Sequence, residues 1–252
     1  MRSFKTAALI ICICSFAFAC GSGGGDKSTS PTQEQVIGLK TNILRTVSPG
    51  DNWEYSVTAT WSDGTATDNL SGSSTVSILF DTQRSPVSGI DCLDKYKVID
   101  MTGSRGKFVR SSHTYFFQDA NGTHYNCGWG TEVKWVTSPP KGYFLSAESP
   151  LAVGQSYSTS VAYDNGDSGT YSYSVESIEY VSIEMGTYES YRIETNYTHS
   201  YTNGHRTEGN DTIWYVPGLG AIKKISNFSH YTGEKTHVWQ FVYILTGTSV
   251  TY

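Results

Sequence analysis

The stretch from Asp51 to Trp61 alternates between polar and apolar side chains from Asn52 onward. Successive side chains of a β-strand point to opposite faces of a sheet, so a period of two predicts a strand with one buried face. Ser62-Asp63-Gly64 follows at once and is typical of a hairpin turn. This part of the chain is therefore predicted to form antiparallel sheet. The apolar members of the alternation are Trp53, Tyr55, Val57, Ala59 and Trp61.

Strand-like stretches recur along most of the chain. The first half continues with Leu70–Phe80, Asp91–Met101, Arg105–Phe117 and His124–Trp135. The last stretch, His237–Leu245, is apolar on both faces, which predicts a strand that lies between layers or closes a barrel. The chain holds 18 tyrosines, 6 tryptophans and 25 glycines but only 16% charged residues, a composition that fits an all-β exported domain.

The segment before these strands allows two predictions. Residues 33–47 place apolar side chains loosely at helical spacing, which favours a short N-terminal helix. Gly38 and the β-branched residues of the segment weaken a helix. Residues 36–48 are therefore expected to be a lead-in segment, either helical or extended.

The first twenty residues predict export. Arg2 and Lys5 are followed by the mostly apolar stretch Thr6–Ala19, which has the length of a signal-peptide core. Ala17-Phe18-Ala19-Cys20 is similar to the lipobox of bacterial lipoproteins. That similarity implies removal of residues 1–19 as a lipoprotein signal peptide, although the same residues also allow plain secretory cleavage.

A lipid anchor would explain the next stretch. Residues 20–35 are rich in Gly and Ser and are typical of a flexible tether. Lipidation of Cys20 by several acyl chains would hold the protein stably at a membrane. Position 21 is not acidic, so the similarity to lipoproteins implies the bacterial outer membrane, with the protein facing the periplasm or the cell surface.

Charge and cysteine content narrow the partners further. The formal net charge is −5, and loss of Arg2 and Lys5 would make the mature chain more acidic. This disfavours nucleic acid and anionic lipid surfaces, which bind basic patches. In an oxidising envelope, Cys92 and Cys127 are predicted to form a disulfide, the alternative being two separate buried thiols.

The second half of the chain resembles the first. Gly50 and Trp53 are matched by Gly154 and Tyr157, and later glycines and aromatics match in the same order. We therefore predict two related β modules, residues 49–136 and 150–245. The alternative is that any meander rich in Tyr, Thr and Gly aligns with itself.

The segment Ile213–Ile225, IWYVPGLGAIKKI, is the most distinctive in the second module. A phosphate-binding loop would open a helix after its glycines, whereas β-branched and aromatic residues flank this one. Pro217-Gly218 fits the central positions of a type II turn, where glycine supplies positive φ. The segment therefore predicts two strands joined by a turn.

Motifs for chemistry are weak. Asp164–Gly169 lacks the oxygen spacing of a calcium-binding loop and falls where a hairpin turn is expected. His199 and His205 could face each other across a hairpin at Asn203-Gly204, which would allow at most a weak metal site. There is no GxSxG nucleophile elbow and no protease-like cysteine signature. No catalytic residue, metal ligand or cofactor is predicted, and the chain is interpreted as non-enzymatic. The alternative is a hydrolase, which would require a cleft that joins a His to a carboxylate and a nucleophile.

Aromatic residues are the remaining functional signal. They crowd the second module, where the ordinary explanation is cross-strand and core packing. The alternative is a cleft for an apolar or sugar ligand, lined by amphipathic rings. The candidate cleft residues are Tyr171, Tyr173, Tyr191, Trp214 and Tyr215.

A family resemblance joins these observations. Gly186–Ile193 (GTYESYRI) and Ile213–Lys224 (IWYVPGLGAIKK) resemble a pattern of poorly characterised bacterial envelope proteins, the TapB-like group. The resemblance implies an antiparallel sheet curled into an incomplete barrel, similar to the lipoprotein carriers LolA and LolB. It carries over no catalytic residue.

The sequence thus predicts an all-β lipoprotein whose two modules form curved half-barrel sheets. We expect it to bind an apolar ligand, such as a lipid, or another envelope component in the cleft. The alternative is a surface adhesion or carbohydrate-binding module that displays its Tyr and Trp rings on an open face. A solidly packed interior would contradict the first prediction.

Overall fold

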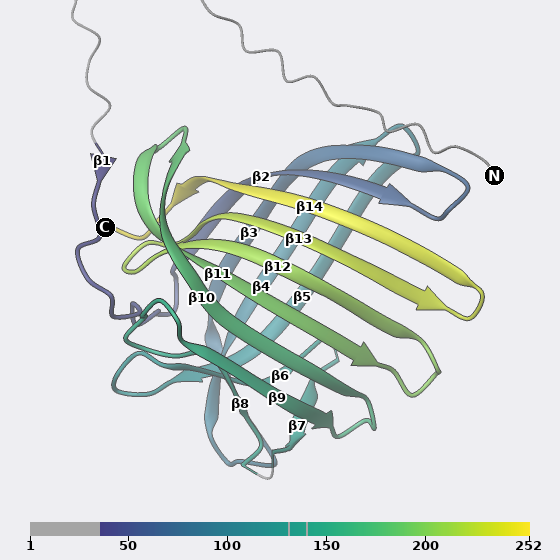
Figure 1. Cartoon of the computed structure of the whole chain (residues 1–252). Helices are drawn as coiled ribbons and strands as arrows, with labels where there is room; N and C mark the ends of the chain where they lie inside the picture. Colours follow the sequence, from purple (N-terminus) through teal and green to yellow (C-terminus); the bar gives the residue numbers. More distant parts are fainter. Residues whose placement is uncertain (1–35, 131, 140) are drawn as a thin grey trace, which may run out of the picture. The chain divides into compact units, whose positions relative to one another are not determined.

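The computed structural model describes residues 36–130, 132–139 and 141–252 as an all-β structure (Figure 1). The predicted signal peptide, the tether and Cys20 lie outside the described residues. In the described part no helix is long and apolar enough to cross a membrane. The strands are β1 Val36–Ile37, β2 Asn52–Ser62, β3 Thr67–Arg84, β4 Asp91–Gly103, β5 Gly106–Gln118, β6 His124–Trp129, β7 Lys134–Ser138, β8 Phe144–Ala147, β9 Ser156–Tyr163, β10 Ser168–Ile183, β11 Gly186–Ser200, β12 Arg206–Val216, β13 Gly220–Thr232 and β14 Lys235–Thr248.

Twelve of these strands close into a barrel. Each strand from β2 to β14 pairs with the next along the chain, except that β7 pairs directly with β9. The last strand pairs with the first, so that Trp239 of β14 lies opposite Trp61 of β2. All pairings in the ring are antiparallel; β8 pairs off the ring with β6, and β1 pairs in parallel with β11. The prediction that the last strand closes a barrel is confirmed.

Closure corrects the prediction of two half-barrels. Residues 34–252 form one compact unit, and the ring has no free edge between the expected modules because β7 pairs with β9 and β14 with β2. Each module contributes six strands to one ring. Gly50 and Gly154 both have φ of +91°, and each donates its N–H to a carbonyl of the following long strand. The internal repeat itself stays a prediction.

The lead-in segment is extended, which corrects the alternative of a short helix. After β1, its backbone is held by side chains of the barrel instead of by helical hydrogen bonds. The N–H of Leu44 donates to Ser149 Oγ (3.1 Å), and that of Val47 donates to Gln118 Oε1 (2.7 Å). Leu44 itself is buried. The segment therefore packs across one end of the barrel.

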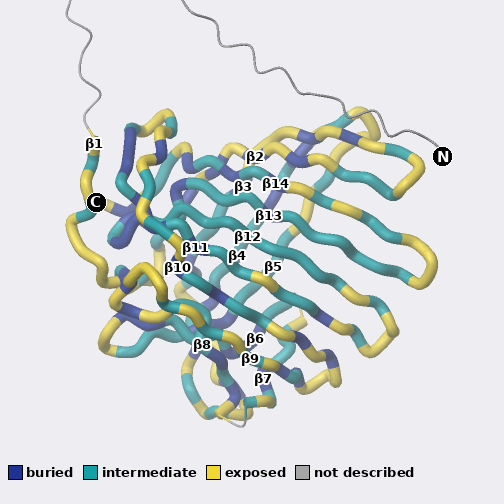
Figure 2. Tube along the Cα trace, in the orientation of Figure 1, coloured by how far each residue is buried: buried dark blue, intermediate teal, exposed yellow. Residues whose placement is uncertain are grey.

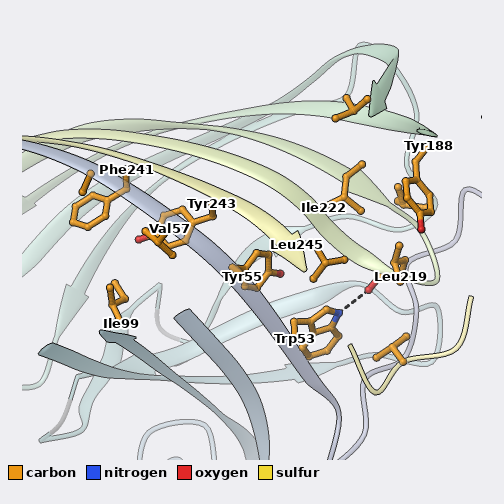
Figure 3. Close-up of a cluster of buried hydrophobic side chains, with 14 of the residues drawn as sticks. Trp53, Tyr55, Val57, Ile99, Tyr188, Leu219, Ile222, Phe241, Tyr243 and Leu245 are labelled. Carbon is orange, nitrogen blue, oxygen red and sulfur yellow. Dashed lines mark hydrogen bonds between the residues drawn. The ribbon is translucent and has the colours of Figure 1, made fainter. Parts of the chain in front are cut away.

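Part of the core lies at this closed end. The segment IWYVPGLGAIKKI forms the end of β12, a turn and β13, as predicted, and its turn packs against Trp53 (Figure 3). Trp53 Nε1 donates to the Leu219 carbonyl (2.7 Å). Gly220 has φ of +113°, and a Cβ there would lie 2.9 Å from Trp53 Nε1. Leu245 of β14 is fully buried beside them.

The predicted disulfide is confirmed. Cys92 at the start of β4 is bonded to Cys127 of β6, and their Cα atoms are 6.8 Å apart. Both side chains are fully buried, next to Tyr115 of the intervening strand β5. The disulfide therefore ties together three neighbouring strands of the barrel wall.

Candidate functional site

The inner face of the barrel is the site candidate. Alternation along β2 turns the side chains at Trp53, Tyr55 and Val57 inward and leaves Glu54 and Ser56 between them exposed. Inward side chains of β12 and β13 are mostly of intermediate burial, unlike the core at the closed end (Figure 2). These side chains are only partly buried because protein side chains do not fill the lumen along its whole length.

A cavity of about 820 Å³ occupies the lumen toward the other end, which we call the open end. Its lining includes Trp61 and His237, which flank the β2–β3 and β13–β14 turns, and Tyr201, which begins the β11–β12 turn. It therefore reaches the rim formed by these hairpin turns. Ligand sites of proteins typically enclose roughly 300–1,000 Å³, so this cavity is large enough to be one.

A second chamber of about 330 Å³ adjoins the first. Phe241 and Tyr243 of β14 and Ile99 of β4 line the second chamber but not the first, and they lie farther from the rim than Trp61 and His237. The two chambers therefore form one continuous lumen with an outer and an inner part. Six residues line both chambers: Arg110, Asn126, Trp129, Phe144, Tyr171 and Phe228.

One wall of the lumen is a row of stacked aromatic rings on β13 and β14. Trp239 and Phe241 are stacked with centroids 5.3 Å apart, and Phe241 and Tyr243 follow at 5.9 Å. Phe228 stacks on Phe241 at 5.9 Å from the neighbouring strand. These rings give the wall a flat apolar surface on which hydrocarbon can pack.

The facing wall carries tyrosines of β9, β10 and β11. The hydroxyls of Tyr163 and Tyr171 are 3.1 Å apart, and Phe144 stacks on the Tyr171 ring at 5.0 Å. Burial raises the pKa of Tyr163, Tyr171 and Tyr197, so their phenols stay neutral at physiological pH. This wall is therefore amphipathic but uncharged.

Basic side chains enter the inner chamber. Lys97 of β4, Arg110 of β5 and Lys224 of β13 all line it. Lys97 Nζ lies 4.0 Å from the centroid of the Tyr243 ring, and Lys224 Nζ pairs with Asp211 Oδ2 at 2.7 Å. The lumen is thus apolar along its walls and lined by basic side chains at its inner part.

A buried carboxylate organises the rim. Asp167, in the β9–β10 turn, accepts hydrogen bonds from Lys134 Nζ (2.7 Å) and from the Thr202 N–H (3.0 Å). Burial alone would raise the pKa of Asp167, but these bonds and one from Asn165 lower it. The carboxylate links the β9–β10 turn, the β11–β12 turn and the start of β7. The turn predicted at Asp164–Gly169 is present over residues 164–167, between the end of β9 and the start of β10.

His199 lies beside this carboxylate. Its Nε2 is 3.5 Å from Asp167 Oδ2 and makes no hydrogen bond, and burial lowers the pKa of the imidazole although Asp167 opposes this. On β12 the residue paired with His199 is Thr207, so His199 and His205, which the sequence allowed to face each other, are not paired. Among the described residues no group of three His, Cys, Asp or Glu could hold a metal ion.

The five aromatic candidates fall in three places. Tyr171 and Tyr173 line the lumen, as expected for a ligand cleft. Tyr191 and Tyr215 are paired across β11 and β12 and pack with Leu44 at the closed end. Trp214 lies on the outer face, where its Nε1 donates to Glu179 Oε2 (2.9 Å) and Lys223 Nζ stands 4.6 Å over its ring.

The basic residues of the lumen were missed by sequence reasoning, but the sequence carries a signal for them. Lys97 is in phase with Ile99 and Met101, both buried on the inner face of β4. A lysine in phase with the apolar face of a strand is expected to point inward. The same test places Arg110 in phase with Phe108 on β5.

Comparisons with known proteins give two similar structures. No family model matches the chain, and no curated protein matches it. One structure, from Bacteroides fragilis, is described as an inferred exported protein with a YmcC-like fold; it is 9% identical, with 82% of this chain and 99% of that chain covered and a TM-score of 0.36. The other, from Parabacteroides distasonis, is described as an inferred lipoprotein; it is 11% identical, with 84% and 99% covered and a TM-score of 0.37. The resemblance to the TapB-like group stays a prediction.

Proposed function

We propose that this protein is a lipid-anchored protein of the bacterial envelope that binds an apolar ligand, or the apolar part of another envelope component, inside its barrel. One observation carries the proposal: the lumen contains a cavity of about 820 Å³ lined by aromatic side chains on two facing walls. The lipobox-like Ala17-Phe18-Ala19-Cys20 supports the anchor.

The distribution of side chains supports a ligand inside the barrel. The strands are polar on their outer face and partly apolar on their inner face. Because protein side chains do not fill the lumen, this apolar inner surface is exposed to the cavity. Burying such surface contributes about 25 cal/mol per Å², so an apolar molecule gains free energy by leaving water for this cavity. A solidly packed interior would have contradicted the proposal, and the interior is not solidly packed.

The adhesion alternative is less well supported. It requires several rings side by side on an outer face. Among the large apolar side chains of the described residues, the exposed rings are Phe80 (80%) and Tyr180 (67%). They lie on β3 and β10, which are not neighbours in the sheet. They therefore do not form a shared platform for a sugar.

The test is native mass spectrometry of the protein purified from its own membrane without strong detergent. We expect a bound molecule in the wild type. The variant Thr195→Trp should lose it, because Thr195 lines the cavity of about 820 Å³ and a tryptophan would fill part of that space. The matched control is Thr198→Trp on the same strand, because the Thr198 hydroxyl lies on the exposed outer face, 2.7 Å from that of Thr170, and this variant should keep the ligand. Equal occupancy in both variants would contradict a lumenal site.

The anchor is tested separately. Cys20→Ala should release the protein from the membrane fraction, since several acyl chains are needed for stable attachment. Density separation of inner and outer membranes then tests the predicted outer-membrane location. Retention of the Cys20→Ala protein in the membrane would contradict lipidation at this residue.

A further inference from the structure

Basic groups outnumber acidic groups inside the barrel. Lys97, Arg110 and Lys224 line the inner chamber. Lys95 comes two residues before Lys97 and lies on the same face of β4. Among the described residues that line either chamber, Asp211 is the one carboxylate. This carboxylate is already paired, because Lys224 Nζ lies 2.7 Å from Asp211 Oδ2.

The other lumenal cations make no ion pair with an acidic side chain of the described residues. Arg110 makes no ion pair or hydrogen bond to protein there, and Lys97 contacts the Tyr243 ring and is attracted, without an ion pair, by the Asp211 that Lys224 already holds. Lys95 lies 5.8 Å from the Phe116 ring. Charges removed from water without a partner cost free energy, so this arrangement is unfavourable in the empty barrel.

The local charge is opposite to that of the whole chain, whose formal net charge is −5. Burial, followed by the nearby Lys224, lowers the pKa of Lys95 to about 8 and lowers that of Lys97 well below its usual value. Lys97 lines the inner chamber, so its exposed part faces the lumen. An anion in the chamber would stabilise its charged form.

We propose that the inner chamber binds the acidic group, a carboxylate or phosphate, of a single-chain amphiphile whose apolar tail lies between the aromatic walls of the outer chamber. This inference rests on the proposed function, since it names the class of ligand for the same lumen. An anion beside Lys97 and Arg110 would supply the partner that the protein lacks.

The order of side chains along the barrel sets the orientation of the ligand. The register pairs Ile99 with Arg110, and Lys97 lies two residues farther than Ile99 from the β4–β5 turn at the rim. Lys97 is therefore deeper in the barrel than Arg110. Trp61 and Trp239 line only the outer chamber, on the rim side of these cations. The acidic group therefore enters first, and the tail extends toward the rim.

Two other ligand classes fit less well. A neutral lipid would satisfy the aromatic walls but would leave Lys97 and Arg110 without an anion. A small inorganic anion would satisfy the cations but would leave the aromatic outer chamber filled with water. A ligand with one acidic end and one apolar chain satisfies both parts of the lumen.

The experiment is calorimetric titration of the full mature chain carrying Cys20→Ala, so that no detergent or attached acyl chain competes for the lumen. The probes are palmitate, hexadecyl phosphate, hexadecanol and inorganic phosphate. Because a hydrogen bond to a charged group contributes about 1.5–3 kcal/mol, we expect the two amphiphilic acids to bind about 10- to 100-fold more tightly than hexadecanol.

Variants assign the effect to the lumenal cations. Lys97→Met and Arg110→Met should each weaken palmitate binding about 10-fold or more and leave hexadecanol binding nearly unchanged. Lys97→Arg should restore most of the affinity. The matched control is Lys107→Met, because Lys107 lies on the outer side of β5, where it pairs with Asp100 at 2.9 Å. Circular dichroism verifies that each variant is folded.

The outcomes separate the two proposals. Equal affinity for palmitate and hexadecanol, unaffected by Lys97→Met, would overturn the acidic-group assignment and leave the apolar-ligand function standing. Binding of inorganic phosphate as tightly as hexadecyl phosphate would also overturn the amphiphile assignment. No binding of any probe would overturn it together with the apolar-ligand function for chains of this size.

Discussion

The two ends of the barrel use the same strand alternation but differ in what fills them. At the closed end, the lead-in segment and the turn at Leu219 cover Trp53, Val216 and Leu245, all of them buried. At the open end, the inward side chains are as aromatic, with Trp61 and Trp239, yet they surround a cavity. The lead-in segment fills the closed end, whereas β8, which also lies outside the ring, contributes Phe144 to the cavity lining and leaves the space open. One end therefore stabilises the barrel and the other offers space for a ligand.

The largest expected difference in stability is between alanine substitutions of the tryptophans at the two ends. Trp53→Ala removes a buried ring and its hydrogen bond to Leu219, and large-to-small core substitutions of this kind cost about 3–5 kcal/mol. Trp61→Ala removes a ring that faces the cavity, and we expect it to cost under about 1 kcal/mol. Urea denaturation monitored by circular dichroism measures both. Equal losses of unfolding free energy would break the distinction between the ends.

A smaller difference is expected at two turn glycines. Gly220 at the closed end has φ of +113° and no room for a Cβ beside Trp53, whereas Gly64 at the open end has φ of +83° and nothing within 4 Å. Gly220→Ala should therefore cost about 2–3 kcal/mol, from both backbone strain and the clash, and Gly64→Ala about 1 kcal/mol from strain alone. Thermal unfolding of the two variants provides the comparison. A larger cost at Gly64 would show that packing at the closed end is loose.

The smallest expected effect comes from Lys95 in the empty lumen. Its pKa is lowered to about 8 in the folded protein by burial and by Lys224, while the unfolded value is about 10.4. Between about pH 8 and pH 10.4, Lys95 therefore binds more protons in the unfolded chain than in the folded protein. In this pH range its titration makes the free energy of unfolding increase with pH. Lys95→Met should remove roughly 1 kcal/mol of the rise between pH 8 and 9.5. Denaturation of wild type and variant at both pH values measures the difference, and identical pH profiles would contradict it.

Much of the fold could be predicted because strand alternation is a local signal. Asp51–Trp61 forms β2 almost as expected, and the disulfide between Cys92 and Cys127 follows from the oxidising compartment. Closure of the ring could not be predicted in this way. It depends on pairing between β14 and β2, which are far apart in the sequence, and the resemblance to open half-barrels favoured the wrong alternative.

The site was predicted only in part, for reasons of geometry. Trp214 and Tyr215 are adjacent in β12 and therefore cannot both face the lumen. Tyr171 and Tyr173, two residues apart in β10, can and do. Aromatic content alone did not separate lumen from core. The informative signal is the phase of Lys97 with the buried Ile99 and Met101, which aromatic content does not contain.

The central claim is that the ligand occupies the open end and leaves the closed end unchanged. The most direct measurement is tryptophan fluorescence during titration with palmitate brominated at the end of its chain, since bromine quenches only nearby indoles. Two Cys20→Ala proteins are compared, one that keeps Trp239 as its sole tryptophan and one that keeps Trp53, with the others replaced by Phe. We predict strong saturable quenching of Trp239 and almost none of Trp53. Equal quenching of both, or quenching of Trp53 alone, would contradict the claim.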